Sequence, residues 1–323
     1  MSSAREIDLT TLRLEQDGRV LTAFYANPPL NLITTAFLKD LDRLTRAVDR
    51  DPTIGAVVLT SDLPGRFMIH VDAEELGSMV GLPLPRLRPG AVLPVWKASD
   101  RALGLPGGES VGTRLGTLGA GMLWAHRWKK STLRMNRSGV VYLAAIGGPT
   151  LAGGTEIALA CDIRYAADDP SVVFGQSEIL FGMLPGGGGT QRLTRHIGPG
   201  RALEMILEGS TIDAAQALDH GLVQRLVPSG ELLTRTQAAA ARLATRPRGA
   251  VSAAKRLAYA ATDRPLRRGL DHELAAFIAA GTAETPKRVL PILAQESKEH
   301  GETPLLSDPR TWLDGGRLNN RST

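Results

Sequence analysis

The feature that most constrains the fold is an apolar run that leads into a glycine-rich turn. Residues 140–146 read VVYLAAI, which is typical of a strand buried on both faces. The chain then passes through Gly153 and Gly154 into an apolar stretch that predicts a helix over 153–161. Because glycines at a helix N-terminus let a ligand approach the backbone N–H groups closely, we expect this turn to favour negative charge.

The remaining patterns place strands early and helices late. An Asp17-Gly18 pair between two alternating runs predicts a hairpin over 8–26, and helical spacing follows over 34–49. Further strands are expected at 55–60, 162–167 and 171–174, and helices at 190–197, 202–207 and through most of 214–295. The fold class we expect is α/β.

Residues 77–128 differ in composition from the rest of the chain. They hold five prolines and a glycine-studded stretch over 104–121, which we interpret as a surface loop rather than a dinucleotide-binding turn. Residues 82–137 carry ten Lys/Arg against two acidic residues. The segment is either a lid whose arginines, among them Arg86, Arg88 and Arg101, meet anionic phosphates, or a solvated basic loop.

Composition excludes several classes of protein. The chain has a single cysteine, Cys161, so no intramolecular disulfide can form, and it has no uninterrupted apolar run long enough to span a membrane. The N-terminus is charged where a signal peptide would be apolar. The histidines lack metal-type spacing, and we expect no metal site. These patterns indicate a cytoplasmic globular protein.

Two glutamates beside glycine-rich turns are the candidate acid and base. Glu156 follows the first turn, although an acid there also complements the helix dipole. Glu178 lies among Phe174, Ile179 and Phe181, where desolvation should raise its pKa, although it could instead cap a helix or pair with Arg192. Two such carboxylates together indicate paired acid–base chemistry.

Three long motifs resemble the enoyl-CoA hydratase/isomerase (crotonase) superfamily: GGTEIALACDIRYAADD, FGQSEILFGMLPGGGGTQRLTRHIG and GRALEMILEGSTIDAAQALDHGLVQRLVP. The resemblance is strong over 140–228, fair over 8–76, and weak over 77–139 and beyond 260. It implies a crotonase-like spiral of ββα repeats with a C-terminal helical trimerisation region. The division that we expect is a core over 1–212 with a basic insertion at 77–128, a helical oligomerisation region over 213–298, and a tail over 299–323.

The resemblance also implies roles for individual residues. Glu156 and Glu178 fall where hydratases of this family keep their catalytic glutamates. The backbone amides of Val71 and Gly153 fall where the oxyanion hole lies. Substrate and coenzyme A would also be bound by Asp72, Ala73 and Glu74, which follow Val71 in the chain.

The function implied is an enoyl-CoA hydratase, which adds water in the syn sense to a trans-2-enoyl-CoA thioester. No cofactor is expected, since coenzyme A is part of the substrate. The partners implied are the acyl-CoA and further copies of the chain in a homotrimer or hexamer. The alternatives are a Δ3-Δ2 enoyl-CoA isomerase, another enolate-stabilising crotonase, or a catalytically weak acyl-CoA-binding protein.

The sequence departs from the family pattern at the first oxyanion position. His70-Val71-Asp72 replaces the usual glycine-alanine-aspartate, and both replacements are bulkier than the usual residues. His70 is either an extra polar group near the thioester or a surface histidine, and a damaged oxyanion hole is a third possibility. Trp96, Trp124 and Trp128 lie among basic residues, where we favour lid packing or partner contact over RNA binding.

Overall fold

The computed structural model describes residues 3–82 and 85–319. Its strands are β1 (Leu12–Asp17), β2 (Val20–Tyr25), β3 (Ala56–Ser61), β4 (Val141–Ile146), β5 (Thr150–Leu151), β6 (Ile163–Ala167), β7 (Val173–Gly175), β8 (Thr211–Asp213) and β9 (Arg225–Val227). Short 3₁₀ helices are η1 (Ala4–Glu6), η2 (Glu178–Phe181), η3 (Ser229–Glu231) and η4 (Ala261–Asp263).

The helices of the first two thirds of the chain are α1 (Thr35–Arg50), α2 (Ala73–Val80), α3 (Pro89–Leu103), α4 (Gly108–Arg114), α5 (Gly116–Met135), α6 (Gly153–Ala160), α7 (Gly189–Ile197) and α8 (Pro199–Glu208). Those that follow are α9 (Ala214–Asp219), α10 (Leu232–Ala244), α11 (Arg248–Ala260), α12 (Leu266–Gly281), α13 (Glu284–His300), α14 (Pro304–Ser307), α15 (Pro309–Leu313) and α16 (Gly316–Asn319).

Two sheets organise the core. One has the order β1-β2-β3-β4-β6-β9, in which only the β1–β2 hairpin is antiparallel, and the other has the order β5-β7-β8. The hairpin turns at Asp17-Gly18 as its sequence predicts, with Gly18 at φ 53°. The mixed α/β class is therefore confirmed.

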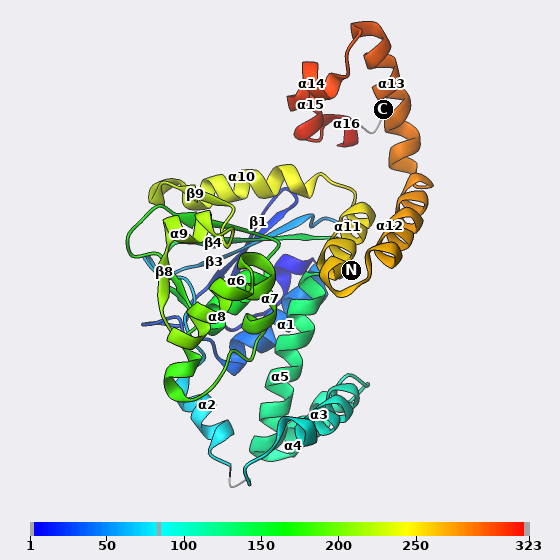
Figure 1. The fold of residues 1–323 in the computed structure, drawn as a ribbon. Helices are drawn as coiled ribbons and strands as arrows, with labels where there is room; N and C mark the ends of the chain where they lie inside the picture. The colour runs from blue at the N-terminus through cyan, green and yellow to red at the C-terminus, as the bar shows by residue number, and fades with distance from the viewer. Residues whose placement is uncertain (1–2, 83–84, 320–323) are drawn as a thin grey trace.

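The central strand β4 carries the strongest sequence signal because it is buried throughout. All six of its residues are buried, which explains the uninterrupted apolar run. Helix α10 packs across β2, β3, β4 and β6, while α1 packs against α5 (Figure 1). Strand β9 thus belongs to the core sheet and helix α10 packs on it, although both follow residue 212. The domain boundaries themselves stay a prediction.

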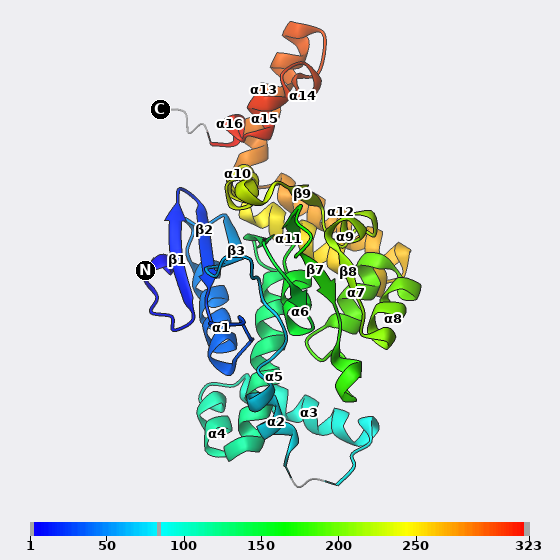
Figure 2. The same cartoon turned by 90° about the vertical axis from the view of Figure 1, so that its left-hand side faces the viewer.

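The expectation of an irregular loop over 77–128 is wrong, because most of this segment is helical. Helices α2 to α5 form a lobe below the sheet (Figures 1 and 2). Pro89 occupies the first turn of α3, where a missing N–H costs no hydrogen bond. A Cβ on Gly108 would lie 2.2 Å from the Ala102 carbonyl, and one on Gly119 would lie 2.0 Å from the Gly112 carbonyl. These glycines are close-approach positions between helices rather than loop signals.

Part of the positive charge of this lobe is neutralised within the fold. Arg127 pairs with Glu109 at 2.8 Å and Lys129 with Asp100 at 2.6 Å. Asp100 also holds the buried His126, whose Nδ1 lies 2.8 Å away. The acidic residues of the segment therefore fix its helices to one another.

The C-terminal helices leave the body of the molecule. Helices α12 and α13 extend away from the sheets, and α14 to α16 fold back beyond them (Figure 1). Arg246 donates hydrogen bonds to the Trp312 and Leu313 carbonyls, so the end of the chain is attached to the end of α10. No helix of the described residues is long and apolar enough to cross a membrane.

Candidate active site

The turn before α6 is strained at a residue that is not glycine. Ala152 has φ 48° and ψ −119°, a conformation that L-residues rarely adopt, and its amide donates to the Gly175 carbonyl at 2.9 Å. Helix α6 begins directly afterwards at Gly153. A Cβ on Gly154 would lie 1.8 Å from the Met68 carbonyl, so the turn packs against the chain just before Val71.

Val71 and Gly153, whose amides the resemblance assigns to the oxyanion hole, lie next to each other. The 70–72 loop pairs with Ile33, which donates to the His70 carbonyl (3.0 Å) and accepts from the Asp72 amide (2.8 Å). A Cβ built on Gly153 would lie 3.5 Å from Val71 Cγ2. In the described part of the chain neither amide donates to a protein acceptor, so both N–H groups can bind a ligand oxygen.

His70 holds the loop rather than standing free. Its Nδ1 lies 2.8 Å from the Val71 carbonyl, and with a proton on Nδ1 the ring donates to that oxygen. Among the described non-glycine residues, positive φ occurs at Asn31 and Ala152 and not at Val71. The backbone at Val71 therefore does not require glycine, and the strain lies across the site at Ala152.

Glu156 is buried and held by a glycine-rich loop. It is 3% exposed, and its Oε1 accepts hydrogen bonds from the Gly187 and Gly189 amides, both at 2.7 Å. Burial raises the pKa of Glu156 to about 7, even though the two amides stabilise the carboxylate, and the charge of Glu178 raises it further. The carboxyl group of Glu156 therefore gains or loses its proton near neutral pH. A carboxylate that only complements the dipole of α6 would have no need of such a pKa.

Glu178 lies at the start of η2 and is 8% exposed. With its amide nitrogen turned toward Glu178, the buried Gln176 lies 3.0 Å from both carboxylate oxygens. Burial raises the pKa of Glu178. Arg192 does not pair with it: the guanidinium donates instead to Asn136 Oδ1 (3.0 Å) and the Gly187 carbonyl (3.3 Å). The alternative of an ion pair is therefore wrong.

Sequence reasoning missed the side chain that closes the site. Trp128 is 2% exposed, its Nε1 donates to the Gly187 carbonyl at 2.8 Å, and a Cβ on Gly153 would lie 3.0 Å from its Cη2. Trp128 thus contacts both the Gly153 turn and the loop that holds Glu156. The signal in the sequence was that tryptophans lie among basic residues. It favoured lid packing or partner contact, but it did not indicate which residues Trp128 would contact.

The residues expected to bind coenzyme A lie at the start of α2. Asp72 caps this helix, since its Oδ1 accepts from the amides of Glu74 (2.9 Å) and Glu75 (3.0 Å). Ala73 and Glu74 form its first turn. All three adjoin the Val71 amide in the chain, and their contact with coenzyme A stays a prediction.

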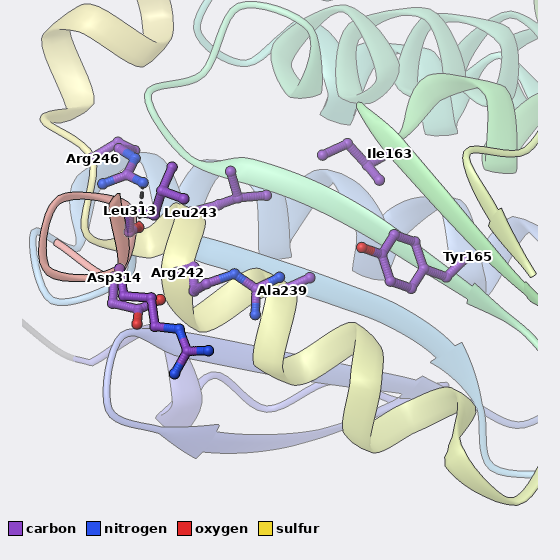
Figure 3. Close-up of a pocket in the computed structure, with 9 residues that line it drawn as sticks. Ile163, Tyr165, Ala239, Arg242, Leu243, Arg246, Leu313 and Asp314 are labelled. Carbon is purple, nitrogen blue, oxygen red and sulfur yellow. Dashed lines mark hydrogen bonds between the residues drawn. The ribbon is translucent and has the colours of Figure 1, made fainter. Parts of the chain in front are cut away.

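Two cavities lie outside the pair of glutamates. One, of about 550 Å³, is lined by residues of β6, α10 and the C-terminal helices, including Tyr165, Arg242 and Asp314 (Figure 3). The other, of about 760 Å³, is lined by α5, the 186–188 loop, α7 and the end of α11. Neither lining includes Glu156, Glu178, Val71 or Gly153, and the chemistry of the site is argued from those four residues.

The arrangement can perform proton transfer next to a developing negative charge. Two amides are available to an oxygen atom, burial raises the pKa of both carboxyl groups, and the charge of Glu178 raises that of Glu156 further. Such a pair can accept one proton and deliver another in a single reaction.

Comparison with known proteins identifies the family of this chain. The enoyl-CoA hydratase/isomerase family model matches residues 122–290. A probable enoyl-CoA hydratase of Mycobacterium bovis is 31% identical over 275 residues, covering 85% of this chain and 91% of its own. The short-chain-enoyl-CoA hydratase of Clostridium acetobutylicum is 27% identical, covering 91% and 98% of the two chains.

Solved structures show the same fold. An enoyl-CoA hydratase from Geobacillus kaustophilus superposes with a TM-score of 0.72 at 26% identity, covering 92% of this chain and 97% of its own. DspI of Pseudomonas aeruginosa gives a TM-score of 0.73 at 26% identity, covering 94% and 99%. The fold is the crotonase fold, and the chain belongs to the enoyl-CoA hydratase/isomerase family.

Proposed function

We propose that this protein is an enoyl-CoA hydratase that adds water in the syn sense to a trans-2-enoyl-CoA thioester. The observation that carries the proposal is the pair of buried glutamates, both with raised pKa, beside the amides of Val71 and Gly153, which donate to no acceptor among the described residues. The two relatives described above are named as enoyl-CoA hydratases, which supports the same function. Fatty-acid or related acyl-CoA metabolism is the setting that fits this substrate.

The amides of Val71 and Gly153 polarise the substrate. The thioester oxygen accepts a hydrogen bond from each, which draws electrons from the conjugated alkene and stabilises the enolate that forms. Loss of one such donor typically costs about 3–4 kcal/mol of transition-state stabilisation. The role of residues 72–74 in this proposal is to line the entry for the pantetheine and adenine parts of the substrate.

The two glutamates move the two protons that hydration requires. Ionised Glu156 takes a proton from a water molecule, whose oxygen bonds to the β-carbon. The alkene electrons pass to the α-carbon through the enolate, and protonated Glu178 supplies the α-proton. Glu156 then releases its proton to solvent and Glu178 takes one up, which restores the pair for the next cycle. No metal or separate cofactor takes part in these steps, and coenzyme A leaves as part of the 3-hydroxyacyl product.

An isomerase is the second candidate, because moving one proton between two carbons needs only one carboxylate. The specific observation that favours hydration is the burial of Glu156 with two amides on a single oxygen, which leaves Oε2 without a protein donor in the described residues. That oxygen is available to orient a water molecule.

Self-association through α12 completes the proposal. Leu266, Leu270, Leu274, Phe277 and Ile278 recur at helical spacing and are 54–77% exposed, on a helix that extends from the body (Figure 1). Such an apolar stripe needs a covering partner. A further copy of this chain, in a trimer or a dimer of trimers, is the occupant that we propose.

The hydratase proposal is tested by the loss of conjugated-thioester absorbance when the protein is mixed with crotonyl-CoA in D₂O. Formation of 3-hydroxybutyryl-CoA with one deuterium at the α-carbon supports it. Conversion of a trans-3-enoyl-CoA without hydration would favour the isomerase, and binding of crotonyl-CoA without turnover would favour an acyl-CoA-binding protein.

A further inference from the structure

The cavity of about 760 Å³ lies behind the active site. Trp128 and the 186–188 loop line it, and the same two features form the wall next to Gly153 and Glu156. Because Trp128 is almost fully buried and bonded to Gly187, the indole separates the cavity from the amide of Gly153. The volume lies in the range of small-molecule sites.

The lining of this cavity is strongly cationic. Its charged members are one aspartate and six cations: Lys129, Arg137, Arg192, Arg195, Arg256 and Arg264. Asp263 pairs with Arg195 at 2.6 Å, and Lys129 pairs with Asp100 at 2.6 Å. The cavity-lining cations outside these two ion pairs are Arg137, Arg192, Arg256 and Arg264.

The remaining four arginines have no carboxylate within ion-pair distance among residues 3–82 and 85–319. Arg192 is mostly buried and donates to Asn136 and Gly187, and Arg256 donates to the Ser252 hydroxyl. Within the part of the chain that the structure describes, the side chains of Arg137 and Arg264 donate no hydrogen bond. Four guanidinium groups that converge without counter-charges favour an anionic ligand, and their planar donors suit phosphate oxygens.

The same cavity presents aromatic surface. Trp96, Trp124 and Trp128 line it, and the rings of Trp124 and Trp128 have centroids 5.0 Å apart. The Trp124 Nε1 atom is buried and has no acceptor in the described part of the chain. Tryptophan faces bind flat aromatic rings by stacking, and Trp96 and Trp124 are only partly buried.

We propose that this cavity is a nucleotide site, which takes a purine nucleoside diphosphate with its base against Trp96 and Trp124 and its phosphates on the arginines. The site is distinct from the pair of glutamates and does not depend on the hydratase reaction. An adenosine diphosphate group could come from a free nucleotide or from the nucleotide end of a coenzyme A molecule. The test must separate these sources.

The experiment is calorimetric titration of the full-length protein with ADP at low ionic strength. Arg256→Ala with Arg264→Ala should weaken ADP binding by about 100-fold, roughly tenfold for each lost charge-assisted contact. The matched control is Arg267→Ala with Arg268→Ala, which removes two arginines of α12 that do not line the cavity and should leave binding unchanged. Circular dichroism confirms that both variants are folded.

Inorganic pyrophosphate is the second probe, because it carries the charge without the base. Binding at least tenfold weaker than that of ADP supports the aromatic contacts, whereas equal binding of the two would overturn a nucleotide site. Absence of ADP binding, or equal loss in both arginine variants, would also overturn it. Coenzyme A that competes with ADP assigns the occupant to its nucleotide end, and coenzyme A that binds an ADP-saturated protein assigns it to a free nucleotide.

Discussion

Trp128 donates a hydrogen bond from its indole Nε1 to the carbonyl of Gly187, at 2.8 Å. A Cβ on Gly187 would lie 2.2 Å from the indole, so only glycine allows this contact. The amide of the same glycine donates to Glu156. Helix α5, which carries Trp128, therefore supports the loop that holds a proposed catalytic glutamate.

Trp128→Phe tests this support. Phenylalanine keeps much of the packing but removes the N–H, which leaves the Gly187 carbonyl with only the longer contact from Arg192. We expect kcat to fall by about tenfold while KM changes little, with a loss of roughly 1 kcal/mol in the free energy of unfolding. Steady-state kinetics and urea unfolding measure the two effects. The control is Trp96→Phe, and an unchanged kcat in Trp128→Phe would contradict the positioning role.

The raised pKa of Glu156 predicts a pH-dependent stability. A carboxyl with a pKa of about 7 in the folded protein and an ordinary value when unfolded favours folding at low pH, and this contribution is lost as the pH rises from about 4.5 through 7. The loss amounts to about 3 kcal/mol. Glu156→Gln keeps an oxygen for the Gly187 and Gly189 amides but does not titrate.

The measurement is urea unfolding at pH 5 and pH 8 for the wild type and Glu156→Gln. We expect the wild type to lose more stability than the variant between these pH values, because Glu178, whose pKa is also raised, titrates in both proteins whereas Glu156 titrates only in the wild type. The same pH dependence in the two proteins would show that Glu156 keeps an ordinary pKa.

The strain at Ala152 predicts an unusual response to glycine. Glycine usually destabilises a buried alanine position by about 1 kcal/mol, but a non-glycine residue in this backbone conformation costs about 1–3 kcal/mol. Ala152→Gly should therefore be neutral or stabilising by up to about 1 kcal/mol. Ala158→Gly, inside the buried α6, is the matched control and should destabilise. Equal destabilisation of the two variants in urea would argue against strain at Ala152.

The exposed stripe on α12 predicts that assembly depends on its apolar side chains. Phe277 is 76% exposed, so Phe277→Glu should preserve the fold of each chain and lower the molar mass measured by light scattering. Arg267→Glu, on the same helix but outside the stripe, is the control. A monomeric wild type, or an unchanged mass in Phe277→Glu, would contradict self-association through this helix.

The sequence predicted those parts of the fold that depend on local pattern. The Asp17-Gly18 hairpin and the buried strand β4 are confirmed because turn chemistry and two-sided burial leave direct marks on residue type. Residues 77–128 were predicted wrongly because glycine permits both loops and close helix contacts. Gly108 and Gly119 serve the second purpose, which only the packed structure reveals.

The residues of the candidate site also divide into those that the sequence indicated and those that only the packed structure reveals. Glu156 and Glu178 were recognisable because each stands beside a glycine-rich turn, and the structure buries both. The contact of Trp128 with Gly187 joins residues 59 positions apart, and no periodicity encodes it. The strain at Ala152 was missed for a related reason: alanine is compatible with almost any local structure, so its positive φ leaves no signal in the sequence.

The most direct measurement of the central claim is the rate of crotonyl-CoA hydration in the wild type, Glu156→Gln and Glu178→Gln. Each variant retains the size of its side chain but can no longer exchange a proton. We predict that kcat falls by about 100- to 10,000-fold in both, with folding and crotonyl-CoA binding preserved. A wild-type rate in either variant would contradict hydration by two carboxylates.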